Sequence, residues 1–243
     1  MSCLLYCVGR GGLCQESDTP CGVQSQPVFL VSGNGLSAVV SELLESDSPP
    51  DVETVLAYEK VVEYYFGRAT VVPMRYGCFA RESSDVAALL ARHREAYDAL
   101  LQQLEGFVEM GVEVLSGESA GTNSTDPQPA SPNGACDADK SGAAYLSGRK
   151  AHYCASDRTA GQQNEVIESL CGALAGTFAR HKVERPVAGS RLLSVYFLVP
   201  RARAAHFRDV TRESCTEGHT KLLLSGPWPP YNFADLPSES LIS

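Results

Sequence analysis

Cys3-Leu4-Leu5-Tyr6-Cys7-Val8 lies near the start of the chain and is apolar at every position. A half-exposed strand would alternate polar with apolar residues, so this run predicts a strand that is covered on both faces. Glycines follow at Gly9, Gly11 and Gly12 and end the run. We therefore expect the fold to contain a buried strand at this end of the chain.

The next apolar segments predict a hairpin and a helix. Pro27-Val28-Phe29-Leu30-Val31 and Leu36-Ser37-Ala38-Val39-Val40 flank Ser32-Gly33-Asn34-Gly35, and two β-rich runs around a Gly/Asn turn are typical of a β-hairpin. Asp51 follows two prolines and can cap a helix. In that helix the apolar residues recur at helical spacing, at Val52, Val55, Leu56, Val62 and Tyr65.

Residues 70–115 predict a strand, a long helix and a second strand. Pro73, in the strand Thr70-Val71-Val72-Pro73-Met74, cannot donate a hydrogen bond, so this strand lies at an edge or ends there. Ser84 is expected to cap the helix, whose apolar stripe comprises Val86, Leu89, Leu90, His93, Tyr97, Leu100, Leu101 and Leu104. His93 is interpreted as a packed core residue in preference to a ligand. The run 107–115 is the second strand.

The remainder of the chain opens with a polar segment. Residues 116–142 contain no Val, Ile, Leu, Phe or Tyr, so they cannot offset their ordering entropy by burial, and we expect a flexible loop. A helix is predicted over 162–181, with Val166, Ile167, Leu170, Leu174, Phe178 and His181 on one face. The run 192–199 predicts a central strand. A short helix with Phe207 and Val210 and a last strand at 221–225 follow.

Together these elements predict an α+β protein of two small domains. Each domain is expected to be a mostly antiparallel sheet with helices on one face, in a modified ferredoxin-like arrangement. We place the N-terminal α+β domain at residues 1–105 and the C-terminal α+β domain at 106–243. The flexible polar loop, at about 116–142, then belongs to the second domain.

The charge and hydropathy of the chain restrict the class of partner. The 243 residues have a net charge of −9, and no cluster of Lys and Arg is long enough to follow a phosphate backbone, so no nucleic acid is expected as partner. No apolar run approaches the ~20 residues that cross a bilayer, so no lipid membrane is expected either. The first residues lack the positive charge of a secretion signal. We therefore predict a cytoplasmic protein.

The cysteines and histidines form no pattern that indicates chemistry. None of the nine cysteines forms a C-x-x-C pair, the spacing that zinc sites favour, so buried free thiols are preferred to a metal or redox role. The nucleophile-elbow, P-loop, H-E-x-x-H and G-x-G-x-x-G motifs are absent. An acid–base role stays open for His206 and His219, which flank the last helix. We expect no enzyme activity, no cofactor and no metal.

Three short stretches carry the most specific information. They are Val71-Val72-Pro73-Met74-Arg75-Tyr76-Gly77, Gly142-Ala143-Ala144-Tyr145-Leu146 and Gly226-Pro227-Trp228-Pro229-Pro230-Tyr231-Asn232-Phe233. The first resembles the P-[hydrophobic]-R-[aromatic]-G signature of the gas vesicle GvpF/GvpL family, the second its G-x-x-Y-L motif, and the third its terminal G-P-W-P-P-Y-x-F. The chain departs from the family at Tyr58, where members often carry His, and at Cys78, where they tend to have a small hydroxyl residue.

The resemblance implies an accessory or minor structural protein of gas vesicle assembly, located at the gas vesicle. Its implied partners are the hydrophobic major shell protein and other gas vesicle accessory proteins. Edge strands are the expected docking sites, because unpaired backbone groups can add a strand from a partner. Two alternatives stay open. One is a ligand-sensing α+β module or small metabolic enzyme of ferredoxin-like fold, and the other is a purely architectural homo-oligomer.

The resemblance assigns a structural or partner-contact role to the motif residues. These are Pro73, Arg75, Tyr76, Gly77, Tyr145, Leu146, Gly226, Pro227, Trp228, Pro229, Pro230, Tyr231 and Phe233. Arg75 is interpreted as an internal tether in preference to a partner contact. Gly77 is expected to adopt a backbone conformation that a Cβ would hinder. The segment around Trp228 is interpreted as a C-terminal clasp on the sheet, with an exposed aromatic–proline surface as the alternative.

Overall fold

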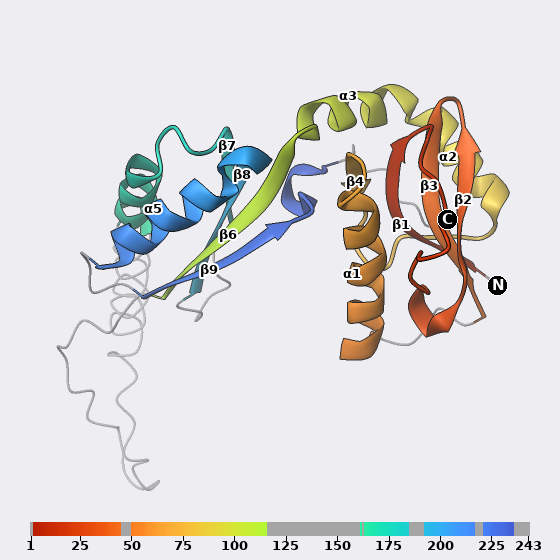
Figure 1. Ribbon diagram of the computed structural model, residues 1–243, viewed down its shortest axis with the longest axis horizontal. Coiled ribbons are helices and arrows are strands. Elements are labelled where there is room, and N and C mark those ends of the chain that lie inside the picture. The colour runs from red at the N-terminus through yellow and green to blue at the C-terminus, as the bar shows by residue number, and fades with distance from the viewer. Residues whose placement is uncertain are drawn as a thin grey trace, which may run out of the picture.

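Two antiparallel sheets, one from each half of the chain, form the two lobes of the molecule (Figure 1). The computed structural model describes residues 2–44, 50–115, 161, 163–184, 192–216 and 221–235. The polar loop expected at 116–142 and the motif residues Tyr145 and Leu146 lie outside these ranges. The predicted α+β class with mostly antiparallel sheets is confirmed.

The first sheet has five strands, β1 Ser2–Arg10, β2 Val28–Gly33, β3 Leu36–Leu43, β4 Val71–Pro73 and β5 Phe79–Ala80. Its order is β2-β3-β1-β4, and β5 also pairs with β1. The buried strand predicted from the first apolar run is β1, which lies between β3 and β4. β4 lies at an edge and ends at Pro73, in agreement with a residue that has no backbone donor.

The hairpin predicted around Asn34 joins β2 to β3. Leu30 pairs with Val39 across the two strands, and the turn residues Asn34 and Gly35 have φ values of 52° and 82°. Positive φ at both central residues is typical of a two-residue type I′ turn, whose twist matches that of the strands. The local sequence therefore determines both the turn and the register of this pair.

Helices cover both faces of the first sheet, where one face was expected. α1 (Val52–Phe66) packs on the face formed by Leu4 and Tyr6 of β1. α2 (Ser83–Arg92) and α3 (Arg94–Leu104) pack on the opposite face, formed by Cys3 and Leu5. Successive residues of a strand point to opposite faces, so the continuous apolar run of β1 requires cover on both sides.

The long helix predicted from Ser84 is divided into α2 and α3. Glu82 occupies the N-cap position of α2, and His93, between the two helices, has φ −107° and ψ 21°. α2 packs on β2 and β3, whereas α3 packs on β1 and β4. The bend therefore lets a single apolar stripe follow the sheet from one edge to the other. His93 is half-buried at the bend.

The second sheet has four strands, β6 Phe107–Leu115, β7 Arg180–Glu184, β8 Leu192–Pro200 and β9 Lys221–Trp228. Its order is β7-β8-β6-β9, so β8 is central as predicted. A helix at residues 163–173 and α5 (Ala204–Thr216) pack on one face, where Leu170, Leu174 and Phe207 are buried against β6 and β8. This order of strands and helices is the ferredoxin-like arrangement.

The helix predicted over 162–181 is shorter than expected. Its helical residues end at 173, and His181 lies on β7. Gly176 has φ 80°, a left-handed conformation that often follows the end of a helix. The ring centroids of Phe178 and His181 lie 4.9 and 6.1 Å from that of Phe197, so both residues still contact the same core. The spacing of Phe178 and His181 predicted a helix, whereas both residues lie beyond the end of that helix, and His181 belongs to a strand.

The first sheet repeats the strand order of the second but lacks one helix. In the second lobe a helix follows the first strand, whereas in the first lobe a loop with a short 3-10 helix, η1 (Val23–Ser25), joins β1 to β2. Val23 packs with α1 in the core on that face. The loop thus takes the place of a helix beside α1, and this is the modification of the ferredoxin-like arrangement in the first lobe.

The two lobes contact each other through the end of α1, through β8 and through the residues that follow β8 and β9. Phe66, at the end of α1, packs against the second core. Arg201 donates a hydrogen bond to the carbonyl oxygen of Phe66 at 3.2 Å, and its guanidinium lies 4.4 Å from the Phe66 ring centroid. Leu198 and Phe233 pack in a core of the first lobe. The boundary predicted near Glu105 lies in the link between α3 and β6.

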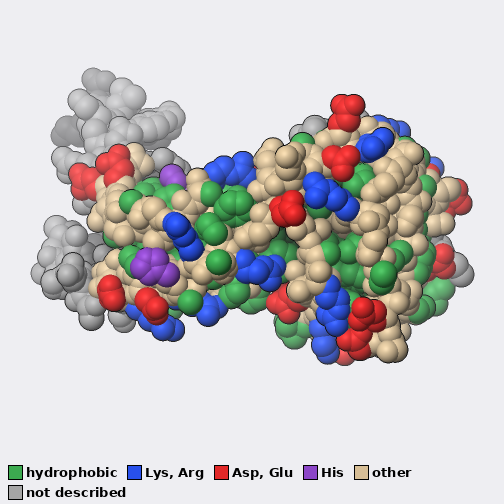
Figure 2. Space-filling model, turned by 45° about the horizontal axis from the view of Figure 1, so that its top comes forward, with side chains coloured by type: hydrophobic (Ala, Val, Ile, Leu, Met, Phe, Trp, Pro, Cys, Tyr) green, Lys and Arg blue, Asp and Glu red, His purple; other side chains and the backbone are tan. Residues whose placement is uncertain are grey.

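Charged side chains of both signs are interspersed over the face seen in Figure 2, with hydrophobic side chains between them. No continuous patch of one sign dominates this face. Among the described residues, no helix has both the length and the hydropathy needed to cross a membrane.

Candidate functional site

Two of the three sequence motifs meet at the junction of the lobes, although they are far apart in the chain. The Arg75 Nη2 atom donates a hydrogen bond to Asn232 Oδ1 at 3.2 Å. Tyr76 and Tyr231 pack against the same core, on the α1 face of the first sheet. The first and third motifs therefore form one continuous part of the surface. The second motif, with Tyr145 and Leu146, lies outside the described residues.

The Pro73–Gly77 motif turns the chain away from the sheet. Pro73 is buried opposite Cys7, and Arg75 is exposed, with its guanidinium directed to the C-terminal segment. The Tyr76 ring lies edge-on to that of Tyr58, with centroids 5.4 Å apart. Gly77 has φ 101°, which side chains with a Cβ rarely adopt. The geometry of Gly77 is thus the one predicted for it.

The Gly226–Phe233 motif ends β9 and then crosses to the first lobe. Gly226 has φ 103°, and a Cβ added there would lie 2.7 Å from the Glu109 carbonyl oxygen. Pro227 is exposed, Pro229 and Pro230 are buried, and Phe233 is 4% exposed in the core beneath α2 and α3. Trp228 differs from these, because 40% of its surface is exposed. The segment therefore packs on both lobes but leaves its indole accessible.

Glu109 is a functional candidate that the sequence analysis missed. Its side chain is 4% exposed on β6, and its two carboxylate oxygens accept hydrogen bonds from the backbone N and the Nδ2 of Asn232, at 2.8 and 2.7 Å. Burial raises the pKa of Glu109, although Asn232, Arg75 and Lys182 oppose this. A carboxylate between Val108 and Met110 in a predicted strand was the available signal, but its partner is distant in sequence.

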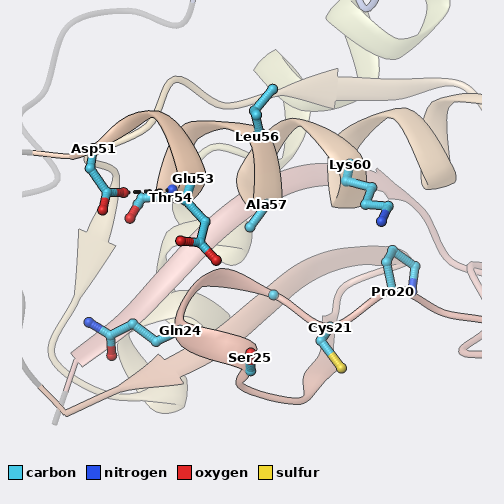
Figure 3. A pocket seen from close by; sticks show the side chains of 11 residues that line it. Pro20, Cys21, Gln24, Ser25, Asp51, Glu53, Thr54, Leu56, Ala57 and Lys60 are labelled. Carbon is cyan, nitrogen blue, oxygen red and sulfur yellow. Dashed lines mark hydrogen bonds between the residues drawn. The ribbon is translucent and has the colours of Figure 1, made fainter.

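A separate groove lies between α1 and the loop that replaces the missing helix (Figure 3). Its volume is about 710 Å³. The loop contributes Pro20, Cys21, Gly22, Gln24 and Ser25, and the helix contributes Asp51, Glu53, Thr54, Leu56, Ala57 and Lys60. In Figure 3 Glu53 and Ala57 point toward the loop, whereas Leu56 points away from it. The groove is therefore partly polar, with an apolar rim on the helix.

Local interactions hold both walls of the groove in place. Asp51 caps α1, because its Oδ1 accepts a hydrogen bond from the Thr54 backbone N at 2.8 Å. Hydrogen bonding to the side chain and then to the backbone of Thr54 lowers the pKa of Asp51. On the loop side, the Val23 backbone N donates to the buried Tyr6 hydroxyl at 2.9 Å. Gln24 and Ser25 have φ values of 54° and 57°, a left-handed conformation that costs energy at non-glycine residues.

Two apolar side chains extend from α1 beside this groove. Val52 is 76% exposed and Leu56 is 58% exposed. They lie four residues apart, and residues at this spacing are neighbours on one side of a helix. The capping residue Asp51 fixes where the helix begins and hence which residues point outward. The outcome is an apolar strip on the surface, which we call the α1 strip.

The chemistry of the described side chains is limited. Within the described ranges, no three or more His, Cys, Asp and Glu residues are grouped so that they could hold a metal ion. His206 is exposed on α5, and His219 lies outside the described residues. Among the cysteines, Cys3 and Cys7 are buried as free thiols, Cys78 and Cys171 are half-buried, and Cys14 and Cys21 are exposed. Burial was therefore predicted correctly for only some of them.

A model of one known protein family covers both sequence motifs that meet at the junction of the lobes. The family model described as gas vesicle synthesis protein GvpL/GvpF matches residues 2–235. The chain belongs to this family. The match extends over both lobes and includes the segment that connects them, so the resemblance inferred from three short motifs is confirmed.

Relatives from bacteria and archaea agree with this assignment. Gas vesicle protein L of Streptomyces sp. (strain CB03234) is 28% identical over 196 residues, which cover 76% of this chain and 70% of the relative. Gas vesicle protein F of the same strain is 26% identical, with 88% and 90% covered. Gas vesicle protein F of Haloferax mediterranei is 23% identical, with 87% and 84% covered. The GvpL/GvpF family assignment supports a role of this protein in gas vesicles.

Solved structures of family members share the fold. The crystal structure of GvpF from Anabaena sp. PCC7120 superimposes with a TM-score of 0.75 at 18% sequence identity, covering 98% of each chain. GvpF from Microcystis aeruginosa gives a TM-score of 0.74 at 14% identity, covering 97% of this chain and 99% of that one. The two-lobed arrangement is therefore common to this chain and to GvpF proteins of very different sequence.

Proposed function

We propose that this protein is an accessory or minor structural component of gas vesicle assembly that binds the hydrophobic major shell protein through the α1 strip. Membership in the GvpL/GvpF family supports the gas vesicle role. The single observation that carries the choice of surface is the exposure of Val52 and Leu56 beside the groove. The proposed role is one of binding and involves no chemical conversion.

The physical reason is the need to cover apolar surface before a shell assembles. Unassembled apolar subunits aggregate unless another protein shields them. Burying one aliphatic side chain is worth about 1.5–3 kcal/mol, so Val52 and Leu56 can contribute a substantial part of a weak, reversible interaction. Reversibility suits an assembly factor, because the subunit has to leave for the growing shell.

Binding of the purified shell protein to paired variants tests this surface. We expect Val52→Glu/Leu56→Glu to weaken binding at least about tenfold, because each substitution would bury a charge. Leu223→Glu is the matched control, since Leu223 is 54% exposed on the edge strand β9, outside the groove. Equal binding by the double variant would contradict the proposal. Loss with Leu223→Glu instead would favour docking on an edge strand, the site expected from the sequence.

A further inference from the structure

A second, smaller cavity lies at the junction of the lobes, away from the α1 strip. Its volume is about 220 Å³. Glu59 and Glu63 of α1 line it from the first lobe, and Glu109 of β6 lines it from the second. Trp228 and Tyr231 supply aromatic rings, and Asn232 lies beside Glu109. We call this cavity the junction pocket.

The junction pocket combines three carboxylates with no compensating cation of its own. No Lys or Arg is among its described lining residues. Within the described part of the chain, Glu59, Glu63 and Glu109 form no ion pair. The nearby Arg75 is bonded to Asn232, and Lys182 is paired with Asp235. The lining itself is therefore negatively charged, and Arg75 and Lys182 act on Glu109 only from outside it.

The burial of Glu109 makes its negative charge energetically unfavourable. A buried carboxylate normally requires a cation as well as hydrogen bonds, yet the described hydrogen bonds to Glu109 come from the neutral donors of Asn232. The same carboxylates also act on the hydroxyl of Tyr231. Burial raises the pKa of Tyr231, and the carboxylates of Glu59, Glu63 and Glu109 raise it further. A cation in the pocket would relieve both groups.

The aromatic rings indicate an organic cation. Trp228 is an aromatic residue among the exposed large hydrophobic residues that the structure describes, and the face of an indole attracts an ammonium or guanidinium group placed over it. Small-molecule sites usually have volumes of about 300–1,000 Å³. A cavity of about 220 Å³ is smaller and fits the head of one side chain.

We propose that the junction pocket binds the cationic head of a lysine or arginine side chain presented by a protein partner. The carboxylates would pair with the positive charge, and the Trp228 ring would pack against the apolar part of the bound side chain. Because the lining residues come from both lobes, the bound side chain would also connect the lobes. This site is separate from the α1 strip, so it adds a charge-dependent contact to a partner interaction and does not depend on the proposed function.

Fluorescence provides a direct test, because Trp228 is the only tryptophan in the chain. The full-length protein is titrated at constant ionic strength with acetyl-Gly-Lys-Gly-amide, acetyl-Gly-Arg-Gly-amide and the neutral acetyl-Gly-norleucine-Gly-amide. We expect a saturable change in Trp228 emission with the two cationic peptides, at a Kd of about 1–10 mM, and no saturable change with the neutral peptide. An equal change with all three peptides would overturn the proposal.

Charge-matched variants show whether the carboxylates are responsible. Glu59→Gln/Glu63→Gln is expected to weaken binding of the lysine peptide at least about fivefold. Glu42→Gln/Glu95→Gln removes the same net charge from exposed positions on β3 and α3, and binding should be unchanged. Unchanged binding by the first pair would overturn the proposal. Tighter binding of putrescine than of either peptide would identify a small free amine and contradict a protein side chain.

Discussion

At the residue scale, Tyr58 shows how one hydroxyl connects α1 to β1 and to the residue that follows β4. It lies on α1 and is 2% exposed, and its hydroxyl is 2.7 Å from the Met74 carbonyl oxygen and 2.9 Å from that of Leu5. Tyr58 also stacks on Tyr6, with ring centroids 4.9 Å apart. Tyr58, at which the sequence analysis expected a departure from the family pattern, therefore has its own partners in this structure.

Removing this hydroxyl should destabilise the first lobe. We expect Tyr58→Phe to lower the free energy of unfolding in urea by about 1–3 kcal/mol, because a buried carbonyl oxygen would lose its donor. Tyr76→Phe is the control, since the Tyr76 hydroxyl makes no hydrogen bond among the described residues. Equal losses for the two variants would contradict a specific role of the Tyr58 hydroxyl.

Glu109 should make stability depend on pH. Its pKa is raised in the folded state by burial, so the unfolded chain loses this proton first as the pH rises. The contribution of Glu109 is therefore fully present below its unfolded pKa and is lost as the pH rises through the folded pKa.

The variant Glu109→Gln isolates this effect, because it cannot ionise. Relative to the variant, the wild type should become less stable between about pH 4 and about pH 7. Urea unfolding of both proteins at the two pH values measures the change. A difference that stays constant, or one that grows in favour of the wild type at higher pH, would contradict the account.

At the scale of elements, the segment that follows β9 packs on both lobes. It carries the hydrogen bonds from Asn232 to Glu109 and places Phe233 in a core of the first lobe. Arg180 and Lys182 of β7 also lie over the Phe233 ring, 5.6 and 6.0 Å from its centroid. The segment thus continues the second lobe in the sequence, but its side chains pack against both lobes.

Truncating Phe233 should weaken this connection. Phe233→Ala is expected to cost about 3–5 kcal/mol, the range for removing a buried aromatic side chain, and to lower the melting temperature. Leu223→Ala, at an exposed position, should stay within about 0.5 kcal/mol of the wild type. Calorimetry of the two variants compares them directly, and a small effect at Phe233 would show that the lobes do not depend on this contact.

The elements that were predicted well are those with local causes. The turn at Asn34, the edge position of β4 at Pro73 and the capping of α1 by Asp51 each depend on residues within a few positions. The predictions of elements were wrong where tertiary packing, and not the local sequence, determines the structure. The bend at His93 follows the surface of the sheet, and the start of β7 was assigned to a helix because Phe178 and His181 continue its helical spacing.

The site was less predictable than the fold, because its contacts join distant residues. Motif similarity identified Arg75 and the segment that includes Asn232, but nothing in the local sequence indicates that they touch. Glu109 was missed for the same reason. The groove beside α1 depends on a helix that is absent from the first lobe, and a loop sequence does not reveal the element it replaces.

At the scale of the whole molecule, one difference between two lobes of similar strand order produces the groove. Among the described residues, the second lobe has two helices on one face of its sheet, whereas the corresponding face of the first sheet has α1 and a loop. The groove therefore follows from the fold, and the α1 strip lies on its rim. The junction pocket follows from the way the lobes meet. One molecule thus offers an apolar surface and an acidic pocket.

Light scattering during dilution of denatured shell protein tests the central claim most directly. Alone, the apolar subunit should aggregate, and an equimolar amount of this protein should suppress the scattering. We predict that Val52→Glu/Leu56→Glu loses this suppression and that Leu223→Glu retains it. Scattering that is unaffected by the wild type, or that the double variant suppresses equally well, would contradict the claim that the α1 strip shields shell subunits.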